Sequence, residues 1–182
     1  MKSLQFGLLI AALFVARPVQ AGTGRQTTTF LVEADERAVC RWIEQNPSAI
    51  DESTGAEVLA VRGRQSTLRK ETKEGTFTLL VDHGHELHGL HQHGPNQHAT
   101  DQRVSGQPEQ FRTVLLKSDN AELVSQETEI QVEREGDGSR VTITVVATVS
   151  SHGAMAISLG IRPSLRGMRK LLERRFGSPN DP

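Results

Sequence analysis

The chain of 182 residues contains no tyrosine, one tryptophan and one cysteine, and each scarcity excludes something. Cys40 has no second cysteine with which to form an internal disulfide, so packing has to supply the stability of the fold. Because Cys40 lies in an apolar helical pattern, we expect a buried and unreactive thiol. An aromatic content of 4% argues against a binding pocket that is lined mainly by rings.

A strong charge of one sign is also missing. The chain has 21 basic and 22 acidic residues, which gives a formal net charge of −1. Such a balance supplies no excess of cations to displace counterions from a phosphate backbone. We therefore expect no nucleic-acid partner.

The N-terminus has the features of a secretory signal peptide. Lys2 supplies a positive charge, residues 8–16 form a short apolar run, and Ala21 closes a small-residue cleavage pattern. The run is shorter than the about 20 residues of a transmembrane helix. We expect cleavage after Ala21, so that residues 1–21 are a signal peptide and residues 22–182 form one domain in the periplasm or outside the cell. A retained N-terminal anchor is the alternative.

The remaining chain alternates between patterns of period two and patterns of helical period, in a definite order. Asp35 is a helix N-cap, Pro47 ends that helix, and a short turn over 48–50 and a loop over 51–55 follow. We expect strands over 27–33, 57–62, 66–71, 76–82, 111–117, 122–135 and 140–150. A last helix is expected from Pro163 to the stop at Gly177, in which Gly167 lowers helix propensity by about 1 kcal/mol relative to alanine.

This order resembles the helix-grip fold of the SRPBCC superfamily, which is also called START-like or polyketide-cyclase-like. The resemblance lies in residues 30–43, in the Gly136-Asp137-Gly138 turn between two strands, and in residues 165–176. It covers nearly all of the chain after residue 21, through pattern and not through an invariant motif. It implies an α+β fold in which a curved antiparallel sheet of about six to seven strands wraps around a long C-terminal helix, with a short helix after the first strand.

The resemblance also implies a cavity between the sheet and the last helix that holds an apolar molecule. Strand alternation and helical spacing select the candidate ligand-binding residues for such a cavity. They are Phe77, Leu79, Val81, Val145, Leu165, Met168 and Leu172. The function that we expect is that of an exported, non-catalytic protein that binds a small apolar or lipid-like molecule, and the alternative is a small or filled cavity.

The last helix also carries a basic face, made of Arg162, Arg166, Arg169, Lys170, Arg174 and Arg175. A basic amphipathic helix can lie on an anionic membrane. The commoner role of such a face is to contact solvent while the apolar stripe packs on a core. We expect the second arrangement.

Six of the seven histidines lie between His83 and His98. Two His-x-His pairs, His83 with His85 and His91 with His93, place two imidazoles on one side of an extended chain. Zn²⁺, Cu²⁺ and Ni²⁺ accept imidazole nitrogen, so His83, His85, His88, His91 and His93 are candidate ligands for zinc, copper or nickel.

This cluster supports an alternative function, that of a metal-binding protein or a metal-dependent enzyme. Glycine, proline and few apolar residues predict a flexible loop over 92–110, so adventitious metal binding and a solvated loop stay open as well. No acid, base and nucleophile converge in the sequence, and a non-catalytic role is therefore favoured over an enzyme.

Overall fold

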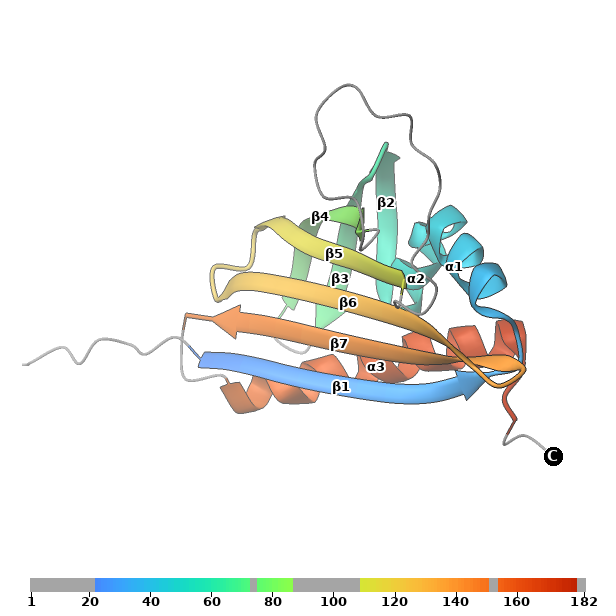
Figure 1. Ribbon diagram of the computed structural model, residues 1–182. Coiled ribbons are helices and arrows are strands. Elements are labelled where there is room, and N and C mark those ends of the chain that lie inside the picture. The colour runs from blue at the N-terminus through green and yellow to red at the C-terminus, as the bar shows by residue number, and fades with distance from the viewer. Residues whose placement is uncertain (1–21, 73–74, 87–108, 151–153, 180–182) are drawn as a thin grey trace, which may run out of the picture.

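The computed structural model describes residues 22–72, 75–86, 109–150 and 154–179, which form seven strands and three helices (Figure 1). In chain order these elements are β1 (Gly22–Val32), α1 (Glu36–Gln45), α2 (Pro47–Ser53), β2 (Ala56–Arg62), β3 (Gln65–Thr72), β4 (Gly75–Glu86), β5 (Glu109–Ser118), β6 (Leu123–Glu135), β7 (Gly138–Val149) and α3 (Ala154–Phe176). The elements follow the predicted order.

The strands form one antiparallel sheet in the order β1-β7-β6-β5-β4-β3-β2. Strands β2 to β7 therefore make a meander, and β1 returns beside the last strand, with Gly22 opposite Val149 and Val32 opposite Ser139. Helix α3 runs along the inner face behind β7 and β1, while α1 and α2 lie at one end of the sheet (Figure 1). The predicted helix-grip fold is confirmed.

Helix α1 begins after an N-cap residue and carries apolar residues at helical spacing. Asp35 accepts a hydrogen bond from the Ala38 amide at 3.0 Å, which satisfies one of the open amides of the first turn. Val39, Cys40 and Ile43 are buried on the side that faces the sheet. The buried position of Cys40, 4% exposed, agrees with the prediction.

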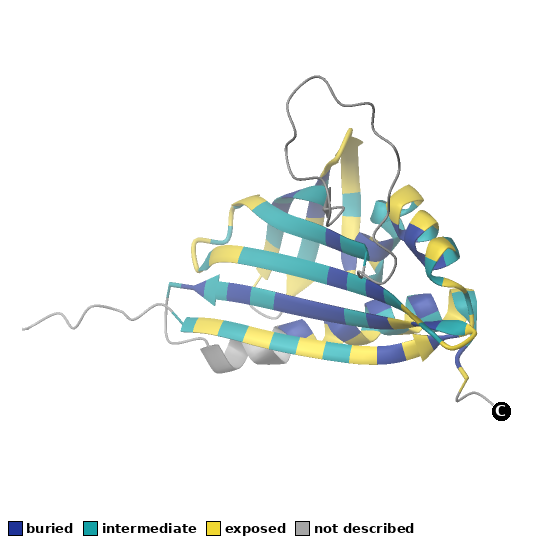
Figure 2. Cartoon of the chain, viewed as in Figure 1, coloured by how far each residue is buried: buried dark blue, intermediate teal, exposed yellow. Residues whose placement is uncertain are grey.

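Two apolar clusters occupy the inner side of the sheet. The larger one joins β1, β5, β6 and β7 to α1, α2 and α3, and Ile143, Met168 and Leu172 are among its most buried members. The smaller one contains Ala56, Leu68, Leu79 and Val81. Burial largely alternates along β7, and in β6 Ile130 and Val132 are buried on the same side (Figure 2), so one face of the sheet packs inward and the other is more exposed.

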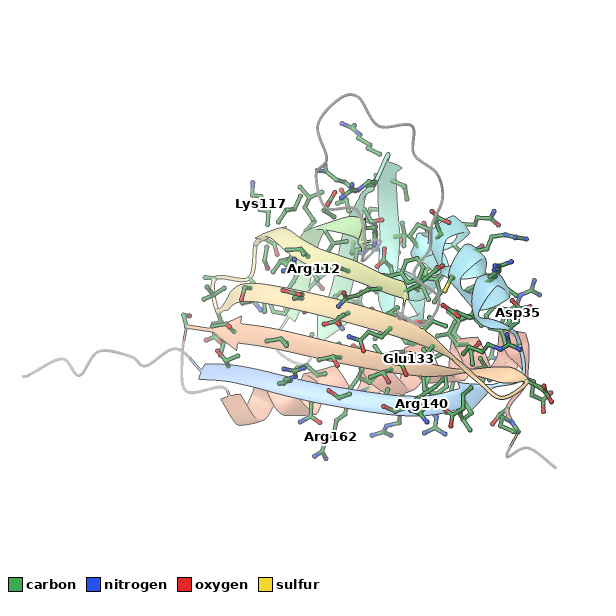
Figure 3. The ribbon with its side chains drawn as sticks, viewed as in Figure 1. Asp35, Arg112, Lys117, Glu133, Arg140 and Arg162 are labelled. Atoms are coloured by element: carbon green, nitrogen blue, oxygen red, sulfur yellow. The ribbon has the colours of Figure 1, made fainter. Side chains whose placement is uncertain are left out.

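The outer face of the sheet is polar. Across β1 and β7, threonine hydroxyls form hydrogen bonds of 3.0 to 3.1 Å in the pairs Thr23–Thr148, Thr27–Thr144 and Thr29–Thr142. Arg112 on β5 pairs with Glu127 on β6, and Arg140 pairs with Glu135. Arg112, Glu133 and Arg140 lie over this face (Figure 3).

Several boundaries differ from the predicted ones. Helix α2 covers Pro47–Ser53, so it is longer than the turn expected over 48–50 and takes up part of the loop expected over 51–55. Strand β4 continues to Glu86, beyond the expected end at residue 82. Helix α3 begins at Ala154, so Pro163 lies inside the helix and not in its first turn. Ile161 is buried ahead of Pro163, and packing on the sheet offsets the hydrogen bond that proline cannot donate. Strand β1 starts at Gly22 because it pairs with β7 along its whole length. The expected loop over 92–110 lies outside the described residues up to 108, and its last two residues belong to β5.

Gly167 has a structural role that helix propensity does not predict. A Cβ atom at this position of α3 would overlap the carbonyl oxygen of Ser53, the last residue of α2, and would lie 2.9 Å from the Ser53 carbonyl carbon. Glycine therefore permits the backbone of α3 to rest directly on α2. This contact sets how deeply α3 sits under the sheet, and so it helps to set the space between them.

Candidate functional site

A cavity of about 240 Å³ lies between the inner face of the sheet, α2 and α3. Its wall is largely aliphatic: Leu68 on β3, Leu79 and Val81 on β4, and Met168 on α3 all contribute. The polar side chains in the wall are Asp51, Thr54, Lys70, Thr72, Thr113, Asn120, Glu122, Gln126, Thr128 and Ser164. Apolar and polar side chains therefore share the wall, and the apolar ones are in the majority.

The two ends of the cavity differ in exposure. At one end, Thr72 of β3 and Glu122 in the β5–β6 turn are exposed. The turn is held beside β4 because the Asp119 amide donates to the Thr78 carbonyl oxygen at 3.2 Å. At the other end, Asp51 and Val81 are both 5% exposed. Among the described residues, the route from solvent therefore lies at the end where the β3–β4 hairpin meets the β5–β6 turn.

A buried polar network closes the less exposed end. His83 Nε2 lies 3.0 Å from Ser66 Oγ, and His83 Nδ1 lies 3.1 Å from Thr113 Oγ1. Asp51 Oδ2 approaches the same Nε2 to 3.1 Å, but no described residue gives this oxygen a hydrogen bond of good geometry. The network ties α2 to β3, β4 and β5.

The geometry of this network differs from that of a hydrolytic triad. In a triad the nucleophile and the carboxylate bind opposite nitrogens of the histidine ring. Here Ser66 and Asp51 both approach Nε2, and Ser66 is completely buried at 0% exposure. The arrangement therefore positions a buried carboxylate in the cavity wall and leaves the serine hydroxyl out of reach of a substrate.

Lys70 on β3 brings a cation into the same wall. Its Nζ donates to Ser164 Oγ of α3 at 3.0 Å, and Ser164 Oγ in turn donates to the Thr54 carbonyl oxygen at 3.4 Å. Burial lowers the pKa of the Lys70 ammonium below its ordinary value of 10.5, because the charged form loses hydration. Within the described part of the chain, no carboxylate forms an ion pair with it.

The structure brings together five of the seven residues that we selected as ligand-binding candidates. Phe77, Leu79, Val81, Val145 and Met168 line the cavity. Leu165 and Leu172, which are 5% and 0% exposed, belong to the larger apolar cluster and not to the cavity wall. Helical spacing identified the buried stripe of α3, but it could not separate positions that face the cavity from positions that face the core.

Of the metal candidates, only the His83 side chain belongs to the described part of the structure. Both of its ring nitrogens lie near protein partners, so a metal there would have to displace Ser66 and Asp51 or Thr113. His85 is on β4, but its side chain lies outside the described residues, as do His88, His91 and His93. The described residues contain no cluster of three histidine, cysteine, aspartate or glutamate side chains that could hold a metal ion. The metal site stays a prediction.

The basic side chains of α3 are exposed except for Arg169, whose guanidinium lies 5.6 Å from the centre of the Phe30 ring. Ile161, Leu165, Met168 and Leu172 are buried on the inner side of α3, so packing already covers the apolar stripe that a membrane would need. Arg162 points away from the body of the molecule (Figure 3). None of the described helices is both long enough and apolar enough to cross a membrane.

The sheet, the terminal helix and the cavity between them together define a helix-grip fold. The sequence matches no family model and no curated protein. Its fold is similar to that of a START superfamily protein from Mycobacterium smegmatis, with 16% identity over 84% of this chain and 96% of that one and a TM-score of 0.54. At this level of sequence identity, the similarity shows a shared fold only.

Two further solved structures share the fold. A protein from Thermus thermophilus is 13% identical over 84% of this chain and 98% of its own, with a TM-score of 0.52. The ginseng major latex-like protein 151 from Panax ginseng is 10% identical over 85% of this chain and 97% of its own, with a TM-score of 0.54. Each of these chains is matched over nearly its whole length.

Proposed function

We propose that the chain is an exported, non-catalytic binding protein that holds a small apolar or lipid-like molecule between the sheet and α3. The cavity is the observation that carries this proposal. Its volume of about 240 Å³ is slightly below the range of roughly 300–1,000 Å³ that is typical of small-molecule pockets. The size favours one compact molecule or a single medium-length chain over a large lipid.

The aliphatic lining supplies the driving force for binding. Transfer of apolar surface from water contributes about 25 cal/mol per Å², so burying roughly 200 Å² of ligand contributes about 5 kcal/mol. Part of that free energy is lost with the translational freedom of the ligand. Because about 5 kcal/mol corresponds to a dissociation constant of about 0.2 mM even before that loss, we expect dissociation constants in the submillimolar to millimolar range for ligands that fill the chamber.

Ligand binding is tested by blocking the cavity from one strand. Ala147 on β7 lines the cavity and is 2% exposed, whereas its neighbour Val146 does not line it. We expect the protein to bind the neutral probe N-phenyl-1-naphthylamine, with a rise in its fluorescence. Ala147→Leu should weaken binding at least about tenfold because the added side chain fills the chamber, and Val146→Leu, the matched control, should bind as the native protein does. Equal binding by the two variants would place the probe elsewhere.

The proposal of export is supported by Lys2, the apolar residues 8–16 and the small-residue pattern that ends at Ala21. When the full chain is produced in a Gram-negative host, we expect it in the periplasmic fraction with Gly22 as its first residue. N-terminal sequencing of the recovered protein tests this. A cytoplasmic protein that still begins with residue 1 would contradict export and would leave the binding proposal intact.

A further inference from the structure

Lys70 is the one cationic side chain in the cavity wall among the residues that the structure describes. It follows Ser66 and Leu68 on the same face of β3, and both of these side chains are buried. Lys70 Nζ reaches across the cavity edge from the sheet to Ser164 on α3, at 3.0 Å. The ammonium therefore lies where sheet and helix meet, next to apolar walls and not in open solvent.

The charge of Lys70 has no counter-charge in the described residues. Among the described residues, the wall holds two other ionisable side chains, Asp51 and Glu122. Asp51 lies at the opposite end beside His83, and Glu122 is exposed in the β5–β6 turn. An ammonium group that is taken out of water without an opposite charge is unfavourable, and a hydroxyl partner compensates for only part of the lost hydration.

Lys70 also has unused hydrogen-bond donors. An ammonium carries three N–H donors, and one of those on Lys70 is given to Ser164. The remaining donors suit an anionic acceptor, because hydrogen bonds between charged groups are shorter and stronger than those between neutral groups. A carboxylate that entered from the exposed end of the cavity would meet the N–H donors of Lys70 before it reached the aliphatic part of the wall.

We infer that the ligand is an amphiphile with a carboxylate head, that Lys70 binds this head beside Ser164, and that the apolar tail extends toward Leu68 and Val81. This inference rests on the proposed function and names the class of ligand within it. Ser66 and Lys70 are roughly 13 Å apart along β3, which leaves room for a medium-length tail between the two polar ends. Asp51 at the far end repels a second anionic group, so the arrangement fixes the direction of the ligand.

The test compares an acid with an alcohol of equal length. Decanoate and 1-decanol are titrated at pH 7 against the purified protein loaded with N-phenyl-1-naphthylamine, and displacement of the probe is followed by fluorescence. At this pH the carboxylic acid is ionised. We expect decanoate to bind about tenfold more tightly than 1-decanol, which is the effect of one charge-assisted hydrogen bond.

Variants then assign the difference to Lys70. Lys70→Met keeps the length of the side chain and removes its charge, so it should weaken decanoate binding about tenfold and leave 1-decanol binding unchanged. Lys117→Met is the matched control, because Lys117 is exposed on β5 and projects away from the molecule (Figure 3). It should change neither affinity.

The outcomes separate the inference from the function on which it rests. Equal affinities for decanoate and 1-decanol in the native protein would overturn the carboxylate assignment and retain an apolar-ligand protein. This comparison needs no variant, so it stands even if Lys70→Met does not fold. Failure of the probe and of both decyl compounds to bind would overturn the proposed function itself. If Lys117→Met weakened decanoate binding as much as Lys70→Met does, the net charge of the protein alone would explain the attraction of decanoate. That result would overturn the assignment to Lys70.

Discussion

The substitution Gly167→Ala tests the contact between α3 and α2 most directly. By helix propensity alone, alanine would stabilise α3 by about 1 kcal/mol. In the structure its Cβ would overlap the Ser53 carbonyl oxygen, which is a backbone atom that cannot rotate away. Helix α3 would have to move outward and loosen the packing of Met168 and Leu172, which are 1% and 0% exposed. Overpacking of this kind typically destabilises a fold by about 1–3 kcal/mol.

The overlap is with a backbone atom, so we take the upper end of this range, about 3 kcal/mol, and subtract the gain of about 1 kcal/mol in helix propensity. We therefore expect Gly167→Ala to lower the free energy of unfolding by about 2 kcal/mol net, measured by urea denaturation followed by circular dichroism. In a domain of this size the melting temperature should fall by roughly 4–8 °C. Arg166→Ala, at the exposed neighbouring position, is the control and should change stability by less than about 0.5 kcal/mol. A Gly167→Ala protein that is more stable than the native one would refute the close approach of α3 to Ser53.

Three further predictions concern Lys70, Cys40 and the histidines. Without ligand, Lys70→Met should melt at a higher temperature than the native protein at pH 7. Burial lowers the pKa of Lys70 in the folded protein, so keeping the ammonium charged there costs free energy of folding, and this cost disappears as the pH rises toward 10.5. A lower melting temperature of the variant at pH 7 would contradict the prediction. Cys40 should react with Ellman's reagent only after denaturant is added, because its thiol is buried, and prompt reaction of the native protein would exclude that burial. The metal alternative predicts one Zn²⁺, Cu²⁺ or Ni²⁺ ion per chain in native mass spectrometry, lost in a His83→Ala/His85→Ala variant, and a bare native mass would count against it.

Local patterns predicted most of the elements. The Asp35 cap, the glycine turn at Gly136 and the alternation in β7 depend on neighbours in the sequence, and the structure has the corresponding elements near the expected positions. Pro163 misled the prediction of where α3 begins, because the buried Ile161 extends the helix beyond a residue that usually limits one. Packing between distant parts of the chain decided that boundary.

The candidate site could be predicted only in part. Alternation placed Phe77, Leu79 and Val81 on one face, and all three line the cavity. Lys70 gave a weaker signal, since the inward positions of β3 read serine, leucine and lysine, which is not a clear apolar alternation. The role of Asp51 could not be predicted, because its contact with His83 joins two residues that are far apart in the sequence.

The pairing of β1 with β7 determines when the sheet can be completed during synthesis. The partner of the first strand is synthesised more than about 100 residues later, because Val32 pairs with Ser139 and Gly22 pairs with Val149. At a synthesis rate of roughly 5–20 residues per second, this delay lasts about 6–25 s. Such distant pairing also makes folding slow. Until β7 is made, the nascent chain cannot complete its sheet, while its N-terminus is already accessible to a translocation apparatus. The strand order therefore delays folding during the period in which the proposed export would begin.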